Sequence, residues 1–267
     1  MQLAWVTDAH LEWLSEGPET NHLAIFLKTL SDSETDGIII SGDISTSQQI
    51  KYHLKKFAQL PMPVYFVLGN HDIYGSSFDY VHRMVRASVK EHKNLTWLTE
   101  AQPIPLTDDT YLIGHDGWAD GRAGMGQKSG LLINDYRAIS DFRGLSVGSV
   151  FSQMQTAADI ASRRLAAQIR NIGAKHIIVV THAPPFLKAC LYQGKPTEDN
   201  FAPHFSNIRM GERLEKAAAN SGARLSILCG HTHDEARVNI NNQITVSVGW
   251  ALYGSPTYTI IDADIGC

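Results

Sequence analysis

Five short polar motifs contain the residue types that bind metal ions or transfer protons. They are Asp8-Ala9-His10, Gly42-Asp43, Gly69-Asn70-His71-Asp72, Thr181-His182 and Gly230-His231-Thr232-His233. Together they offer carboxylates, one amide and several imidazoles, and none of them contains a cysteine. Oxygen and imidazole donors without thiolate suit borderline divalent metals such as manganese, iron, zinc or nickel. The residue types therefore predict a metal-binding centre.

Each motif directly follows a short apolar run. The runs cover residues 3–6, 38–40, 64–68, 177–180 and 225–228. Because they are apolar at consecutive positions, they are typical of strands that are buried on both faces. In open α/β sheets, ligands bind outside the carboxyl ends of the strands. If the strands are parallel, all five motifs meet at one edge of a sheet.

The predicted cluster has more donors than one ion takes. Carboxylates and imidazoles packed together without a cation would be costly, and two ions that share a bridging carboxylate would use the whole set. Gly42, Gly69 and Gly230 stand before candidate ligands, where the chain must turn sharply and approach the ion closely. A single Asp-x-His or Gly-Asp pair is common without any metal. Five such motifs in order, each after an expected strand, favour a two-metal centre.

Five amphipathic segments lie between the apolar runs and have the spacing of one helix face. They cover residues 23–30, 50–57, 78–89, 154–169 and 210–217. Gly173 stands where it would end the fourth of these helices. The alternation of strands and helices favours an α/β fold with a largely parallel central sheet. Residues 243–248 and 258–261 are typical of strands joined by turns, which predicts a second, partly antiparallel sheet.

The segment 114–130 holds six glycines, too many for a helix or a central strand. We predict a long functional loop, or the start of a cap over the site; a disordered excursion is the alternative. His115 would reach the rim of the site or be structural. Trp118 would stack on an aromatic group or anchor the loop. Arg122 would clamp a phosphate or pair with an acidic side chain.

The composition narrows the classes of function. The chain has 267 residues, 43% hydrophobic and 19% charged, which indicates a globular protein and excludes a disordered one. A net charge of -4 argues against a coat for nucleic acid or a membrane surface. The apolar runs are too short to span a bilayer, and no secretion signal is visible. Three cysteines argue against a disulfide scaffold, so we expect a cytoplasmic protein.

The five motifs resemble those of the calcineurin-like metallophosphoesterases, and they extend over residues 8–233. The resemblance implies an α/β fold, a four-layer αββα sandwich of two mixed β-sheets flanked by helices. It also implies a single domain over residues 1–267, with a Gly-rich loop or cap insertion around 114–150. Pro203-His204-Phe205 is similar to a segment of bacterial members of the family, which makes His204 a further candidate for substrate binding.

The resemblance also implies a role for each motif residue. The first metal ion would bind Asp8, His10, Asp43 and His233, and the second would bind Asp43, Asn70, His182 and His231. Asp43 would therefore bridge the two ions. His71 would face the substrate as a catalytic residue, with Asp72 or Asp43 orienting it. The candidates for substrate binding are His115, Trp118, Arg122 and His204.

The implied function is that of a metallophosphoesterase, an enzyme that hydrolyses phosphoester bonds with two divalent ions. A hydroxide that bridges the ions would be the nucleophile, and His71 would protonate the leaving group. We expect a phosphodiesterase that acts on a small diester. The alternatives are a phosphomonoesterase or protein phosphatase, a nuclease, and a non-catalytic interaction scaffold of the same fold. We expect no stable nucleic-acid complex and no membrane association, and the sequence leaves the oligomeric state open.

Overall fold

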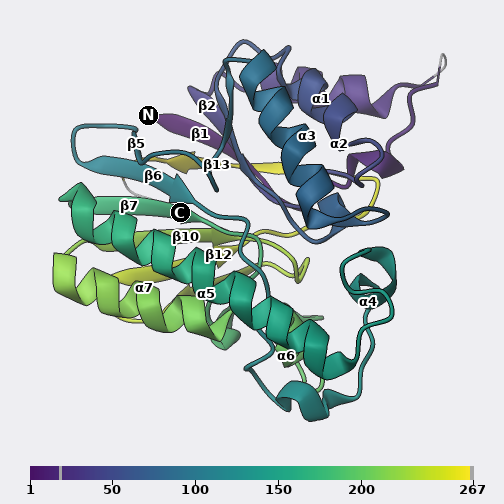
Figure 1. Ribbon diagram of the computed structural model, residues 1–267. Helices are drawn as coiled ribbons and strands as arrows, with labels where there is room; N and C mark the ends of the chain where they lie inside the picture. The colour runs from purple at the N-terminus through teal and green to yellow at the C-terminus, as the bar shows by residue number, and fades with distance from the viewer. Residues whose placement is uncertain (18–19, 265–267) are drawn as a thin grey trace.

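Two β-sheets lie face to face in the middle of the molecule, with helices on both outer faces (Figure 1). The computed structural model describes residues 1–17 and 20–264. Both sheets combine parallel and antiparallel strands. The predicted sandwich of two mixed sheets flanked by helices is therefore confirmed.

The first sheet has the strand order β13-β1-β2-β3-β4. Its strands are β1 (Gln2–Val6), β2 (Gly37–Ser41), β3 (Val64–Val67), β4 (Leu95–Trp97) and β13 (Tyr258–Asp262). Strands β1 to β4 are parallel, and β13 is antiparallel to β1 at the edge. The outer face is covered by α1 (His22–Ser31), α2 (Ile50–Phe57) and α3 (Phe78–Glu91).

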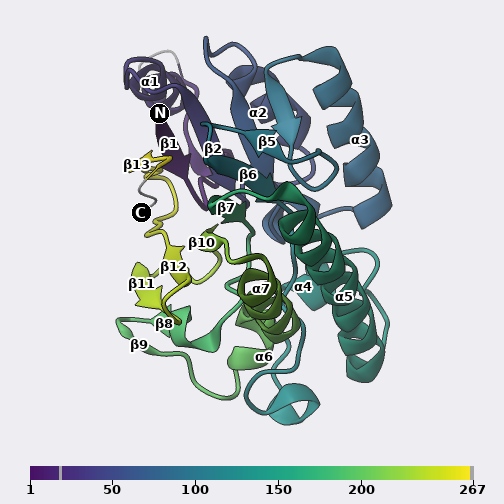
Figure 2. The same cartoon turned by 90° about the vertical axis from the view of Figure 1, so that its left-hand side faces the viewer.

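The second sheet has the strand order β11-β12-β10-β7-β6-β5. Its strands are β5 (Ile104–Pro105), β6 (Thr110–Gly114), β7 (His176–Val180), β10 (Arg224–Cys229), β11 (Ala236–Asn239) and β12 (Ile244–Val248). The inner strands are parallel, and the edge strands β11 and β5 are antiparallel to their neighbours. Helices α5 (Val147–Ile172) and α7 (Ile208–Ser221) lie side by side on its outer face (Figure 2).

Short elements occupy the connections. They are the 3-10 helices η1 (Leu11–Trp13), η2 (His71–Ile73), η3 (Gly126–Ser129) and η4 (Leu187–Ala189), the helices α4 (Asp135–Ala138) and α6 (Ala202–Phe205), and the hairpin strands β8 (Leu191–Tyr192) and β9 (Lys195–Pro196). Residues 115–146 connect β6 to α5 and contain η3 and α4. This connection falls within the region where the sequence predicts a loop or cap.

The five apolar runs are divided between the two sheets. Three of them form β1, β2 and β3 in the first sheet, and two form β7 and β10 in the second. The expectation of one central sheet is therefore wrong, and so is the expectation that 243–248 and 258–261 share a second sheet. In a sandwich, each strand has a helix layer on one face and the other sheet on its other face, so it is apolar on both faces. A strand between two helix layers has the same pattern, and the sequence therefore does not distinguish the two arrangements. The inner faces meet in a core that includes Leu3, Ile178 and Leu228.

Helix α5 has 26 residues and ends at Gly173, as the sequence predicts. Gly173 has a φ of 69°, a left-handed conformation that glycine adopts without a steric cost. The apolar side of α5 packs on α7 and on the second sheet. Within residues 1–17 and 20–264, no helix has both the length and the apolar character of a membrane span.

Candidate metal centre

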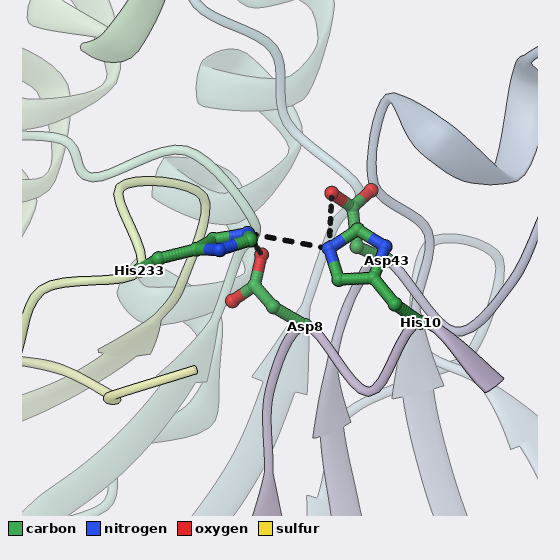
Figure 3. A group of neighbouring side chains, drawn as sticks. All are labelled: Asp8, His10, Asp43 and His233. Atoms are coloured by element: carbon green, nitrogen blue, oxygen red, sulfur yellow. Dashed lines mark hydrogen bonds and ion pairs between the residues drawn. The ribbon is translucent and has the colours of Figure 1, made fainter. Parts of the chain in front are cut away.

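Asp8, His10, Asp43 and His233 meet in one cluster (Figure 3). Their ligand-type atoms all lie within 4.8 Å of one another. The residues come from the turns that follow β1, β2 and β10, so strands of both sheets contribute to the cluster. These are the four side chains expected to bind the first ion. The donors thus meet where the two sheets face each other, and not at the edge of a single sheet as we expected.

The distances in this cluster fit a shared cation. The Nε2 atoms of His10 and His233 lie 3.2 Å apart. Two nitrogens bound to one zinc-like ion at about 2.1 Å would lie roughly 3.0–3.4 Å apart. The carboxylates approach the same point, because His10 Nε2 is 3.7 Å from Asp43 Oδ2 and His233 Nε2 is 3.5 Å from Asp8 Oδ1. His10 Nδ1, which is buried, has no hydrogen-bond partner among the described residues.

A second group of donors lies beside the first. His182 Nε2 is 3.0 Å from Asn70 Oδ1 and 3.4 Å from Asp43 Oδ1. Asn70, His182 and His231 line a cavity of about 10 Å³, roughly the room that one water-sized particle needs. The lining of this cavity also includes Trp118, Ala119, Asp135, Ala183 and His204. Asp43 therefore presents Oδ2 to the first cluster and Oδ1 to the second.

Backbone carbonyls fix the ring orientation of two histidines in the second group. His182 Nδ1 lies 2.9 Å from the carbonyl oxygen of Ser41 and donates to it. His231 Nε2 likewise donates to the carbonyl oxygen of His204, at 2.9 Å. In the neutral form of each ring, the other nitrogen then carries the free lone pair, Nε2 in His182 and Nδ1 in His231. This is the usual way in which proteins set the tautomer of a metal-binding imidazole.

The turns that carry the donors have unusual backbone conformations. Positive φ angles occur at Asp8 (45°), His10 (41°), Asp43 (49°), His231 (74°) and His233 (63°). Non-glycine residues rarely adopt this region, and such strain concentrates at functional sites. The turns support one another, because Asp8 N donates to Gly42 O (3.1 Å) and His231 N donates to Asp8 Oδ1 (3.0 Å).

The electrostatics of the two groups favour bound cations. Burial raises the pKa of Asp43, but the surrounding imidazoles, His182 first, outweigh burial and hold this pKa well below its ordinary value. Burial likewise raises the pKa of Asp8. The hydrogen bond with His233 and the charges of the nearby imidazoles outweigh burial, so this pKa is lowered overall. Burial lowers the pKa of His182, but attraction by Asp43 outweighs it and raises the pKa to about 10. The buried carboxylates are thus anions that require positive charge, which a divalent ion supplies in competition with protons.

His71 lies at the edge of the first cluster. Its ring centroid is 4.6 Å from that of His10, and its ring stacks on Tyr74 at 4.2 Å. Its backbone N–H donates to Asp43 Oδ1 at 2.8 Å. Asp72, one of the two expected partners of its side chain, accepts instead from the backbone N–H groups of Ser45 and Gly69, both at 2.8 Å. Asp72 thus ties the turn after β2 to the turn after β3.

The four candidates for substrate binding lie apart from the first cluster. His115 Nδ1 accepts from the N–H of Gly117 at 3.2 Å, and Trp118 is buried against Phe78 and Phe142. Arg122 pairs with Asp120 (3.1 Å) and Asp159 (3.4 Å). His204 is buried, and its carbonyl oxygen orients His231. Only Trp118 and His204 reach the centre, as lining of the small cavity.

Four residues near the centre were not singled out from the sequence. Glu12 Oε1 lies 3.5 Å from His10 Nδ1, and the ring of Tyr253 lies 4.4 Å from that of His10. Tyr74 and Asp135 both contact Asn70. Glu12 and Tyr74 follow their motifs by two residues, so proximity in sequence was a usable signal for them. Asp135 and Tyr253 carry no such signal, because they reach the centre from segments that are distant in the sequence.

Known proteins resemble this chain in sequence family and in fold. A family model described as calcineurin-like phosphoesterase matches residues 1–235. The solved structure of TT1561 from Thermus thermophilus is similar, with a TM-score of 0.60 and 14% identity over 98% of this chain and 94% of that chain. A dimetal phosphatase from Danio rerio has a TM-score of 0.59 and 11% identity over 97% of this chain and 91% of its own. At these identities the two structures show the fold alone. No curated relative matches the chain in sequence.

Proposed function

The chain belongs to the calcineurin-like phosphoesterase family and is a metal-dependent hydrolase of phosphoesters; from this premise we propose that it is a phosphodiesterase acting on a small diester. The proposed ligands of the first ion are Asp8, His10, Asp43 and His233, and those of the second are Asp43, Asn70, His182 and His231. One observation carries the two-ion assignment: Asp43 faces one donor group with each carboxylate oxygen.

The ions and the protein residues would have different roles in the proposed reaction. When bound, the two ions would supply Lewis acidity and activate water at neutral pH. Asp8 and Asp43 offset only part of the charge of two divalent ions, so the centre attracts an anionic phosphoester despite the net charge of -4 on the whole chain. His71 lies beside the first cluster and is the proposed donor of a proton to the departing oxygen.

The surroundings of the centre support a diester over a monoester. No Lys or Arg side chain of the described residues forms an ion pair or hydrogen bond with the two donor groups. Arg122, the candidate clamp, is neutralised by Asp120 and Asp159. A dianionic monoester would benefit from an added cation that a monoanionic diester does not need. The exposed rings of Trp13 and Tyr253, 5.6 Å apart, suit the organic group of an ester.

A paired hydrolysis assay tests the proposal. The protein is loaded with Mn²⁺, and the turnover of bis-(p-nitrophenyl) phosphate is compared with that of p-nitrophenyl phosphate. We expect a clear preference for the diester, and a loss of both activities in Asp43→Asn. A preference for the monoester would favour the phosphomonoesterase or protein phosphatase. Binding of two ions without cleavage of either compound would favour the interaction scaffold.

We place this activity in the cytoplasm, which is where proteins with few, unpaired cysteines commonly function. Cys190 and Cys229, the cysteines of the described residues, are both buried and free.

A further inference from the structure

A carboxylate from the segment between β6 and α5 reaches into the metal centre. Asp135 is the first residue of α4, and its side chain is buried. Its Oδ1 accepts a hydrogen bond from Asn70 Nδ2 at 3.0 Å and another from the hydroxyl of Tyr74 at 2.6 Å. Asp135 and Asn70 are 65 residues apart in the sequence.

The first of these bonds decides which way the Asn70 amide points. An ionised carboxylate only accepts hydrogen bonds, so the amide must present its NH₂ group to Asp135. The amide oxygen then points the opposite way, toward His182 Nε2 at 3.0 Å and the small cavity that these residues line. Without Asp135, no carboxylate would disfavour the flipped orientation of the Asn70 amide. In that orientation the NH₂ group would point toward the ion.

The second bond extends the effect to His71. The Tyr74 ring stacks on the His71 ring, with centroids 4.2 Å apart and an interplanar angle of 26°. The Tyr74 hydroxyl is held by Asp135 and by Asn70 Nδ2, the latter at 3.2 Å. One carboxylate thus restrains the amide of a proposed ligand and the aromatic ring that supports the proposed proton donor.

Backbone contacts hold the insertion in place for this role. Gly75 N donates to Ala138 O, and Ser140 N donates to Ser76 O, both at 2.8 Å. These two bonds join the end of α4 and the residues just after it to the segment that follows the motif of Asn70 and His71. Asp135 is therefore presented from a fixed backbone, as precise positioning of a ligand requires.

We propose that Asp135 is a positioning residue that the 114–150 insertion supplies to the metal centre. It aims the Asn70 oxygen at the second ion and, through Tyr74, restrains His71. The role rests on the proposed two-metal function. It adds to that function that the insertion is part of the metal centre. Removing the insertion would therefore remove a residue that supports binding of the second ion.

The test measures metal affinity separately from activity. Purified wild type, Asp135→Ala and Asp135→Asn are titrated with Mn²⁺ against a competing chelator, which resolves the tighter and the weaker ion. We expect Asp135→Ala to weaken the second ion by about 10–100-fold, the usual effect of losing a support of a metal ligand. Asp135→Asn keeps an oxygen that accepts from Asn70 and Tyr74, so it should restore the affinity to within a few-fold of wild type.

Asp141→Asn is the matched control, because Asp141 lies in the same insertion but caps α3 through the N–H of Phe78 at 2.9 Å. We expect this variant to keep wild-type affinity for both ions. Wild-type affinity in Asp135→Ala, or an equal loss in Asp141→Asn, would overturn the proposed role. If Asp135→Ala does not fold, Tyr74→Phe tests the same network and should weaken the second ion less; no change there would overturn it. A wild-type protein that binds fewer than two ions would instead refute the two-metal function itself.

Discussion

Asp43 connects the two donor groups, and the residues around it explain how one carboxylate serves both. It is about as buried as Asp8, and its two oxygens face His10 and His182. The backbone N–H of His71 donates to the oxygen on the His182 side. The conformation of the Asp43 carboxylate is thus set by a main-chain bond that no side-chain substitution at position 71 removes.

This arrangement makes the proposed catalytic role of His71 separable from metal binding. We expect His71→Ala to keep both ions, since the N–H bond to Asp43 remains, and to lose about 10²–10⁴-fold in turnover through loss of a proton donor. Metal analysis and turnover of bis-(p-nitrophenyl) phosphate measure the two effects independently. His92→Ala, at the end of α3, is the control and should keep full activity. Full activity in His71→Ala would exclude the role.

At the scale of elements, the turns after the strands are as specialised as the side chains that they carry. A Cβ atom on Gly69 would lie 2.1 Å from Asp43 Oδ1 and 2.6 Å from the nitrogen of Asp43. A Cβ atom on Gly230 would lie 2.0 Å from Asp8 Oδ2. The glycines before the candidate ligands are therefore required by the close approach of one turn to another.

We expect Gly69→Ala to destabilise the protein by about 1–3 kcal/mol, the usual cost of overpacking, and to reduce metal content, because Asp43 must move. Gly148→Ala is the matched control. Gly148 lies in α5 with nothing closer than 3.8 Å to its added Cβ, so this change should be neutral or should stabilise by about 0.5–1 kcal/mol. Urea unfolding and metal analysis compare the two variants. Equal stability in both would contradict the steric argument.

At the scale of the whole molecule, the centre joins the two sheets, and bound ions should therefore stabilise the complete fold. An ion present at 100 times its Kd adds about 2.7 kcal/mol to the free energy of unfolding. For a chain of this size that corresponds to roughly 5–10 °C in Tm for each ion. We expect a chelator to lower Tm by at least this amount and Mn²⁺ to restore it, as scanning calorimetry would record. Asp8→Asn should show a smaller response, and an unchanged wild-type Tm would speak against a structural contribution of the metals.

Acid should destabilise the fold partly through His53, a buried histidine of α2 that lies outside the centre. Its Nδ1 is 2.8 Å from Ser45 Oγ, and burial lowers its pKa from 6.5 to about 4, against the opposing attraction of Glu16. Between these pH values the unfolded chain binds a proton that the folded chain does not. The contribution to stability is therefore complete above pH 6.5 and is lost as the pH falls toward 4.

A comparison with His53→Gln isolates the contribution of His53 to the pH dependence of stability. We expect the loss of unfolding free energy between pH 7 and pH 5 to be about 2 kcal/mol smaller in the variant than in the wild type. Urea unfolding of both proteins at the two pH values, with Mn²⁺ at the same concentration, measures the difference. An identical pH dependence would contradict the prediction, because it would show that folding does not lower the pKa of His53.

The sequence alone determined the local features of this protein. Its apolar runs and helical stripes predicted the strands and helices that carry the site, and Gly173 predicted the end of α5. Its five motifs contain all the side chains that the structure gathers into the two donor groups. These features are readable because the periodicity of burial, the conformation of glycine and the chemistry of a donor depend on a residue and its near neighbours.

Only the tertiary structure decided how these local features combine. It divided the runs between two facing sheets, buried Trp118 and brought Asp135 to Asn70. It also chose the ring nitrogens of His182 and His231 through distant carbonyl oxygens. Contacts of this kind depend on the packing of segments that are far apart in the chain, and a side chain in an irregular loop has no periodicity that reveals its partner. The donor residues could thus be predicted from the sequence, whereas the groups that orient them could not.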